Sequence, residues 1–154
     1  MPFHTEQLVE FRDTDAAGIA HFASFFGWME AAEHRLLRSL GIDILPEQQT
    51  ATEPHATPSD STEQPPDEPA VTWPRINSSC QYHRAARFED LLTVTVNVKK
   101  IGNSAVTYEF GFSNPQGDAI ATGEITSVCC TLSAGGVLAK AEIPPSIRRK
   151  LETL

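Results

Sequence analysis

The sequence lacks the features of a disulfide-rich, zinc-binding or membrane-spanning protein. Its three cysteines, Cys80, Cys129 and Cys130, form an odd set without a C-x-x-C spacing, which predicts reduced, mostly buried thiols and no metal site. No apolar stretch approaches the length of a membrane span, and the first residues show no basic segment followed by an apolar run. We therefore expect a soluble, cytoplasmic protein.

Positive charge is also scarce, with 12 Lys and Arg against 20 Asp and Glu. Six of the acids lie between Pro46 and Ala70, a stretch that has no Lys or Arg, so the rest of the chain carries 14 acids against 12 bases and is nearly balanced. A surface that follows a phosphate backbone needs a basic stripe. We therefore expect no nucleic-acid partner.

The 154 residues suit one domain with a hydrophobic core. Within it, six of the 11 prolines fall between Pro46 and Pro69, and residues 47–70 contain no aliphatic side chain larger than alanine. Such a segment cannot bury enough apolar surface to offset the entropy lost on ordering. We predict a single domain over residues 1–154 with a disordered excursion rich in proline and acids over residues 47–70.

Apolar residues from Phe22 to Leu40 recur at spacings of three and four, which places them on one face of a helix. Gly41 supplies a C-terminal stop. This predicts a helix of about five turns that packs on a sheet. Glu33 falls within the apolar stripe, where we expect it to reach a subunit contact in preference to a functional role. The stripe consists of Phe22, Phe25, Phe26, Met29, Leu36, Leu37 and Leu40.

Strand-like alternation dominates the rest of the chain. Valine occupies every second position from Val94 to Val98, and the pair Gly102-Asn103 then predicts a hairpin turn. Pro145 favours the start of a short terminal helix. The pattern predicts an α+β fold in which one antiparallel sheet wraps around one long central helix. The predicted strands lie at residues 8–12, 71–83, 93–98, 108–112 and 120–132.

A polar turn with Asp13, Asp15 and Gly18 separates the first predicted strand from the helix. The first N–H groups of a helix have no intrahelical partners and form the positive end of its dipole. A bound carbonyl would find donors for a developing oxyanion there, and Asp15 would attack that carbonyl or deprotonate a nearby water. The same residues also suit an Asx turn that leads into a helix cap, and the spacing alone leaves both interpretations open.

The stretch Asp15, Gly18, Ile19, Ala20, His21, Phe22 resembles the D-x-x-G-h-h-x-[YHF] signature of the 4-hydroxybenzoyl-CoA thioesterase family of hotdog proteins. Residues 82–94, 120–132 and 142–152 are also similar to that family, so the resemblance covers nearly all of the chain except the proline-rich part. It implies a hotdog fold and hydrolysis of an acyl-CoA thioester. It also implies that Asp15 is the nucleophile or general base, that the Phe22 backbone N–H polarises the carbonyl, and that Gly18 permits the turn.

The resemblance further implies a homodimer, built by edge-to-edge pairing of sheets, that pairs again in some relatives into a homotetramer, with active sites at the dimer interface. Many relatives carry Tyr-His or Trp-Tyr where this chain has His21-Phe22; the backbone donor survives this change, and His21 becomes either a polar contact to substrate or a structural hydrogen bonder. No cofactor is expected, because CoA is part of the substrate. The candidate substrate contacts, each of which also has an ordinary structural reading, are Phe25 for the acyl group and Arg84, Arg87, Lys99 and Lys100 for phosphates.

Two other functions fit the same fold. One is a thioesterase that acts on an acyl carrier protein, which would dock on a broad basic rim; the nearly balanced charge outside residues 46–70 favours CoA instead. The other is a non-catalytic acyl-CoA-binding protein. The identity of the acyl group, including the choice between aryl and short-chain acyl, is left open by the sequence.

Overall fold

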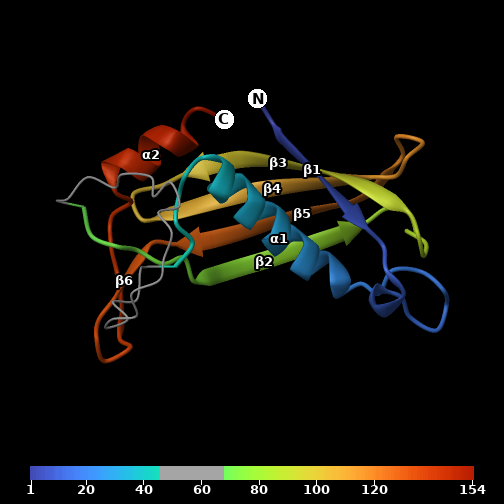
Figure 1. The fold of residues 1–154 in the computed structure, drawn as a ribbon, viewed down its shortest axis with the longest axis horizontal. Helices are drawn as coiled ribbons and strands as arrows, with labels where there is room; N and C mark the ends of the chain where they lie inside the picture. The colour runs from blue at the N-terminus through green and yellow to red at the C-terminus, as the bar shows by residue number, and fades with distance from the viewer. Residues whose placement is uncertain (46–67) are drawn as a thin grey trace, which may run out of the picture.

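In the computed structural model, which describes residues 1–45 and 68–154, one long helix lies across one face of a five-stranded antiparallel sheet (Figure 1). The helix is α1 (Ser24–Ser39), and the spatial order of the strands is β1-β3-β4-β5-β2. A two-stranded hairpin and a short helix complete the described part. The sheet strands are β1 (Phe3–Leu8), β2 (Arg75–Tyr82), β3 (Leu91–Ile101), β4 (Ala105–Ser113) and β5 (Ala119–Val128); the remaining elements are β6 (Cys130–Leu132), β7 (Leu138–Lys140) and α2 (Pro145–Leu151).

This arrangement confirms the predicted α+β layout with one sheet and one central helix. The period-two pattern correctly located β3 and β4, which pair in antiparallel register. Pro145 begins α2, as predicted. Cys80, Cys129 and Cys130 are free thiols, the last two buried. No helix within the described ranges is both long and apolar enough to cross a membrane.

The first predicted strand, at residues 8–12, was wrong. The strand β1 ends at Leu8, and Phe11–Asp13 form one turn of 3-10 helix. The turn closes because the Glu10 N–H donates to the Asp13 carboxylate (2.9 Å) and the Asp13 N–H donates to the Glu10 carbonyl (2.9 Å). Asp13 therefore caps this turn, which leaves its neighbour Asp15 in the following loop.

Three other boundaries differ from the predictions. The helix α1 begins at Ser24, two residues after Phe22, because the Ser24 N–H bonds to the His21 carbonyl in a preceding turn (3.0 Å). The strand predicted from residue 71 begins after Pro74, which has no N–H to donate. The long strand predicted at 120–132 divides at Cys129, whose N–H leaves the ladder to bond the Ser104 carbonyl (2.6 Å).

The core lies between α1 and the sheet. The helix buries Phe25, Trp28 and Met29 near its N-terminal end. At Gly123 in β5 the helix approaches so closely that an added Cβ would clash with the Met29 Sδ and lie 2.9 Å from the Ser79 carbonyl oxygen. A glycine is therefore required at this position for α1 to reach the sheet.

The prediction of a disordered excursion over residues 47–70 concerns mostly residues that lie outside the described ones. At the C-terminal end of that segment, Glu68 is half-buried, and its side chain accepts hydrogen bonds from the N–H (3.1 Å) and the hydroxyl of Ser146 at the start of α2. Among the described residues of that segment, Glu68 is therefore anchored to the last helix.

Candidate active site

The turn that carries Asp15 is a small hairpin between the 3-10 turn and α1. The His21 N–H donates to the Asp13 carbonyl (2.7 Å), and the Asp15 N–H donates to the Ile19 carbonyl (3.0 Å). Gly18 has a φ of +73°, in the left-handed region that favours glycine, and its N–H closes the turn on the Asp15 carbonyl (3.0 Å). The predicted role of Gly18 in permitting the turn agrees with this backbone geometry.

The Asp15 side chain is exposed, and one of its oxygens has a structural partner. Its Oδ1 accepts the Ala17 N–H at 2.8 Å, which is the Asx turn that the sequence suggested as one interpretation. The second oxygen accepts no hydrogen bond from residues 1–45 or 68–154. The turn therefore orients the carboxylate and leaves one oxygen available to a ligand or a water.

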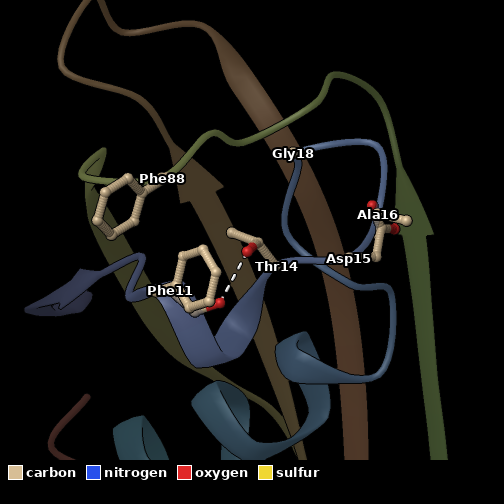
Figure 2. A pocket seen from close by; sticks show the side chains of 6 residues that line it. All are labelled: Phe11, Thr14, Asp15, Ala16, Gly18 and Phe88. Carbon is tan, nitrogen blue, oxygen red and sulfur yellow. Dashed lines mark hydrogen bonds between the residues drawn. The ribbon is translucent and has the colours of Figure 1, made fainter.

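Asp15 lines a pocket of about 530 Å³ together with two exposed aromatic rings (Figure 2). Phe11 comes from the 3-10 turn and Phe88 from the loop between β2 and β3, and their rings meet edge to face with centroids 6.0 Å apart. In Figure 2 these rings lie on one side, and Asp15 and Ala16 lie on the other. The complete lining is Phe11, Thr14, Asp15, Ala16, Gly18 and Phe88.

The predicted carbonyl-polarising donor, the Phe22 N–H, lies in the turn just before α1 and does not line this pocket. It nevertheless differs from its neighbours. The N–H groups of the two residues on each side have intramolecular acceptors, whereas that of Phe22 has none among the described residues. An unpaired backbone donor beside a helix start is suited to a ligand oxygen. The four pairs are Ala20 N to Ala86 O (2.7 Å), His21 N to Asp13 O (2.7 Å), Ala23 N to His21 Nδ1 (3.1 Å) and Ser24 N to His21 O (3.0 Å).

His21 has the structural contact that the sequence offered as one alternative. Its Nδ1 accepts the Ala23 N–H, so in this geometry the ring proton of the neutral imidazole lies on Nε2. Its ring also stacks on that of Phe22, with centroids 4.4 Å apart. The Nε2 donor is therefore the atom through which His21 would contact a substrate.

The predicted substrate contacts are not gathered in one place. Phe25 is buried in the core against Trp28 and Phe112, so its ring packs instead of lining the pocket. Arg84 is exposed in the loop before β3. Lys99 and Lys100 lie eight and nine residues beyond Leu91, the first residue of β3. Because an extended strand rises about 3.3 Å per residue, the two lysines are about 25 Å from the start of that strand.

This distance separates the two lysines from the Asp15 turn of the same chain, because the start of β3 adjoins Leu8 and that turn. Lys99 is also paired with Glu124 across the sheet. Arg87 forms an isolated bridge with Ile19 and so lies against the turn. Of the predicted cationic contacts, Arg87 is therefore the one that the bridge places beside the Asp15 turn of the same chain.

Sequence reasoning missed Phe11, Phe88 and Tyr82. The two phenylalanines are far apart in the chain, and only their exposure marks them as more than core residues. Tyr82, the last residue of β2, donates its hydroxyl to the Phe22 carbonyl at 2.7 Å. No local pattern links Tyr82 to Phe22, because sixty residues separate them.

The expected location of Glu33 was wrong. It is 0% exposed within the single chain, so it does not reach a surface or a subunit contact. Its Oε2 lies 2.7 Å from the Arg75 Nη2 at the start of β2. Burial raises the pKa of Glu33 to about 7 against the attraction of Arg75, and Glu30 raises it further. Glu33 is therefore part of an internal ion pair beneath α1.

Arg75 joins several groups around that pair. One Nη donates to the Trp73 carbonyl (2.7 Å), and the other contacts the His34 Nε2 (3.2 Å). Burial, and then the charge of Arg75, lower the pKa of His34, so the neutral ring accepts this contact. No group of three or more His, Cys, Asp or Glu side chains in the described ranges is arranged to hold a metal ion.

The comparisons with known proteins agree with this architecture. A family model described as the thioesterase-like superfamily matches residues 9–151. The chain belongs to this superfamily. Its match spans the Asp15 turn, α1 and all strands from β2 to β7, which confirms the resemblance drawn from the turn motif.

Solved structures of thioesterases share the fold of this chain at low sequence identity, which confirms the hotdog fold. A 1,4-dihydroxy-2-naphthoyl-CoA thioesterase from Synechocystis is 17% identical, with a TM-score of 0.75 over 100% of this chain and 98% of the other. A mutant 4-hydroxybenzoyl-CoA thioesterase in complex with 4-hydroxybenzoyl-CoA is 19% identical, with a TM-score of 0.75 over 97% and 98%. A putative esterase from Aquifex aeolicus (strain VF5) is 24% identical over 110 residues, 71% of each chain.

Proposed function

We propose that this chain hydrolyses an acyl-CoA thioester. The observation that carries the proposal is the pairing, within one short segment, of an exposed carboxylate at Asp15 with an unpaired backbone donor at Phe22. Superfamily membership supports it, as do the names of the related structures, which describe aryl-CoA thioesterases.

In the proposed reaction the Phe22 N–H donates a hydrogen bond to the carbonyl oxygen of the thioester and stabilises the negative charge that develops there. Asp15 either attacks the carbonyl carbon or removes a proton from the water that attacks it. The C–S bond breaks as the tetrahedral intermediate collapses, and CoA leaves as a thiolate that takes up a proton. If Asp15 is the nucleophile, a water then hydrolyses the anhydride between Asp15 and the acyl group, which releases the carboxylic acid and regenerates the Asp15 carboxylate.

The decisive variant is Asp15→Asn, which removes the anion and keeps the shape of the side chain. We expect kcat/KM for the best acyl-CoA in a panel of aryl, short and long acyl groups to fall about 10²–10⁴-fold. Release of free thiol measures turnover. The matched control is Asp43→Asn, an exposed aspartate beyond the C-terminal end of α1, which should keep wild-type turnover.

Full turnover in Asp15→Asn on every substrate that the wild type cleaves would contradict the proposal. The same acyl groups attached to an acyl carrier protein distinguish an acyl-CoA thioesterase from a carrier-protein thioesterase. A carrier-protein thioesterase would cleave the carrier-bound thioesters faster than the CoA thioesters. Binding of acyl-CoA without any thiol release would identify a non-catalytic binding protein instead.

We further propose that two chains pair edge to edge, as the family resemblance implies, and that β2 is the strand through which they pair. β2 lies at one edge of the sheet, and its outer edge has no strand partner among the described residues. After Arg75 it carries no charged side chain, and Ile76 is 63% exposed. Exposed edge strands of monomers are usually blunted by charges or proline, so these features favour a strand that is covered by a second copy.

Light scattering after size exclusion tests the pairing. We expect the mass of two chains, or of four if dimers pair again, and the mass of one chain for Ile76→Lys, which places a charge on the edge strand. A wild-type mass of one chain at micromolar concentration would contradict the pairing.

A further inference from the structure

Tyr82 connects the end of the edge strand β2 to the segment that holds the proposed carbonyl-polarising donor. Its hydroxyl donates to the Phe22 carbonyl at 2.7 Å, and its ring meets that of Phe25 edge to face, with centroids 5.3 Å apart. Partial burial, and then the neighbouring Cys80, raise the pKa of Tyr82 to about 12. The hydroxyl is therefore protonated at neutral pH and can act as a donor.

Phe22 has few other contacts that would fix its backbone. It precedes α1, so no intrahelical hydrogen bond orients it, and its side chain is 62% exposed. Among the described residues, the bond from Tyr82 is the single hydrogen bond made by the Phe22 backbone. Tyr82 therefore supplies one of the hydrogen bonds that orient this residue.

Hydrogen bonds hold both of the peptide planes on either side of Phe22. The His21 carbonyl accepts the Ser24 N–H (3.0 Å), and because N–H and C=O point in opposite directions in a trans peptide, the Phe22 N–H points away from that turn. In the next peptide, Tyr82 holds the Phe22 carbonyl and the His21 ring holds the Ala23 N–H (3.1 Å). Removing the Tyr82 hydroxyl leaves the Phe22–Ala23 peptide with only the hydrogen bond from the Ala23 N–H to the His21 ring.

We infer that Tyr82 is a positioning residue for the proposed reaction: its hydroxyl fixes the Phe22 carbonyl in the peptide that follows the Phe22 N–H, which limits rotation at Phe22 and keeps that N–H toward the thioester oxygen. The inference rests on the proposed function. Oxyanion stabilisation requires a donor that is already aimed before the charge develops, because reorientation during the reaction costs part of the stabilisation. Tyr82 itself does not touch the reacting atoms in this assignment.

The test variant is Tyr82→Phe, which keeps the ring on Phe25 and removes only the hydroxyl. We expect kcat for the best acyl-CoA to fall about 10-fold, as for a modest misplacement of a catalytic group, while KM changes less than about twofold. The melting temperature should change by less than about 2 °C. The matched control is Tyr108→Phe, which removes the same atom from the chain's other tyrosine, buried in β4, and should leave kcat unchanged.

A second readout does not depend on turnover. In ¹⁵N-labelled protein, Tyr82→Phe should shift the amide resonances of Phe22 and Ala23, and Tyr108→Phe should leave them in place. Wild-type kcat in Tyr82→Phe beside an inactive Asp15→Asn would overturn the positioning role alone. Full activity in Asp15→Asn would overturn the proposed function, and unmoved Phe22 and Ala23 resonances in Tyr82→Phe would overturn the hydrogen bond on which the inference rests.

Discussion

Asp15 and Glu33 carry the same carboxyl group in opposite surroundings. Asp15 lies exposed in a turn, where one oxygen accepts a backbone N–H and the other is open. Glu33 lies on the buried face of α1, where Arg75 is its ionic partner at 2.7 Å. A substrate reaches the first of these groups without disturbing the core, whereas the second is accessible only if the helix leaves the sheet.

The difference in exposure between the two carboxyls distinguishes a charge that is available for catalysis, at Asp15, from one that stabilises the fold, at Glu33. The burial that raises the pKa of Glu33 to about 7 also isolates it from any ligand in the pocket beside Asp15. A perturbed carboxyl in a fold of this kind is often taken as a sign of a functional site. Here the perturbed group is the internal one, and the candidate catalyst is identified by its access and by the unpaired donor at Phe22.

The largest expected effect comes from breaking the internal pair on one side. Arg75→Met leaves Glu33 buried without its cation, and we expect a loss of about 3–5 kcal/mol in the free energy of unfolding, measured with urea. The control is the double variant Glu33→Leu with Arg75→Met, which removes both charges and should recover most of that loss. If the single variant is as stable as the wild type, the ion pair does not hold α1 to β2.

A smaller effect is the pH dependence that Glu33 contributes. Its pKa in the folded chain, about 7, exceeds the ordinary value of 4.5, so the stability that it contributes is present below about pH 4.5 and is lost as the pH rises through 7. Glu33→Gln removes this titration. Its unfolding free energy relative to wild type should therefore rise between pH 5 and pH 8 by on the order of 2 kcal/mol.

Comparison with Glu152→Gln, an exposed carboxyl near the C-terminus, controls for general charge effects. The measured quantity is the difference in unfolding free energy between variant and wild type. This difference cancels the contribution of His34, whose lowered pKa makes both proteins less stable as the pH falls below 6.5. A difference that stays flat across this pH range would show that Glu33 titrates as an ordinary carboxyl.

The smallest stability effect belongs to Asp15. Since Asp15→Asn keeps an oxygen that can accept the Ala17 N–H, its unfolding free energy should change by less than about 1 kcal/mol. Urea unfolding of the same protein preparation used for the turnover assay measures this. A loss as large as that of Arg75→Met would place Asp15 among the structural groups and remove the contrast between the two carboxyls.

Local patterns explain which parts of the fold were predictable. The strict alternation in β3 and the glycine after it suffice to locate that hairpin, whereas β1 has only Phe3 and Leu8 as apolar residues and gives no such signal. β7 is short and exposed throughout, so no apolar face marks it.

The turn around Asp15 was predictable because its residues are contiguous. The contacts of Glu33 with Arg75, of Phe11 with Phe88 and of Phe22 with Tyr82 each join distant parts of the chain, and only the folded sheet brings them together. The expectation that Glu33 sits at a subunit contact failed for this reason, because its partner Arg75 lies on β2, far from α1 in the sequence.

The missing side chain at Gly123 has a consequence for the candidate site. Met29 rests there directly on the sheet, and its Sδ and Cε occupy the space that a methyl group at position 123 would take, so a larger residue would push this side chain of α1 away from β5. The start of α1 at Ser24 is five residues away, about 7.5 Å along the axis. We therefore expect a bulkier residue at position 123 to shift the start of α1, and the Phe22 amide before it, without touching any residue of the pocket.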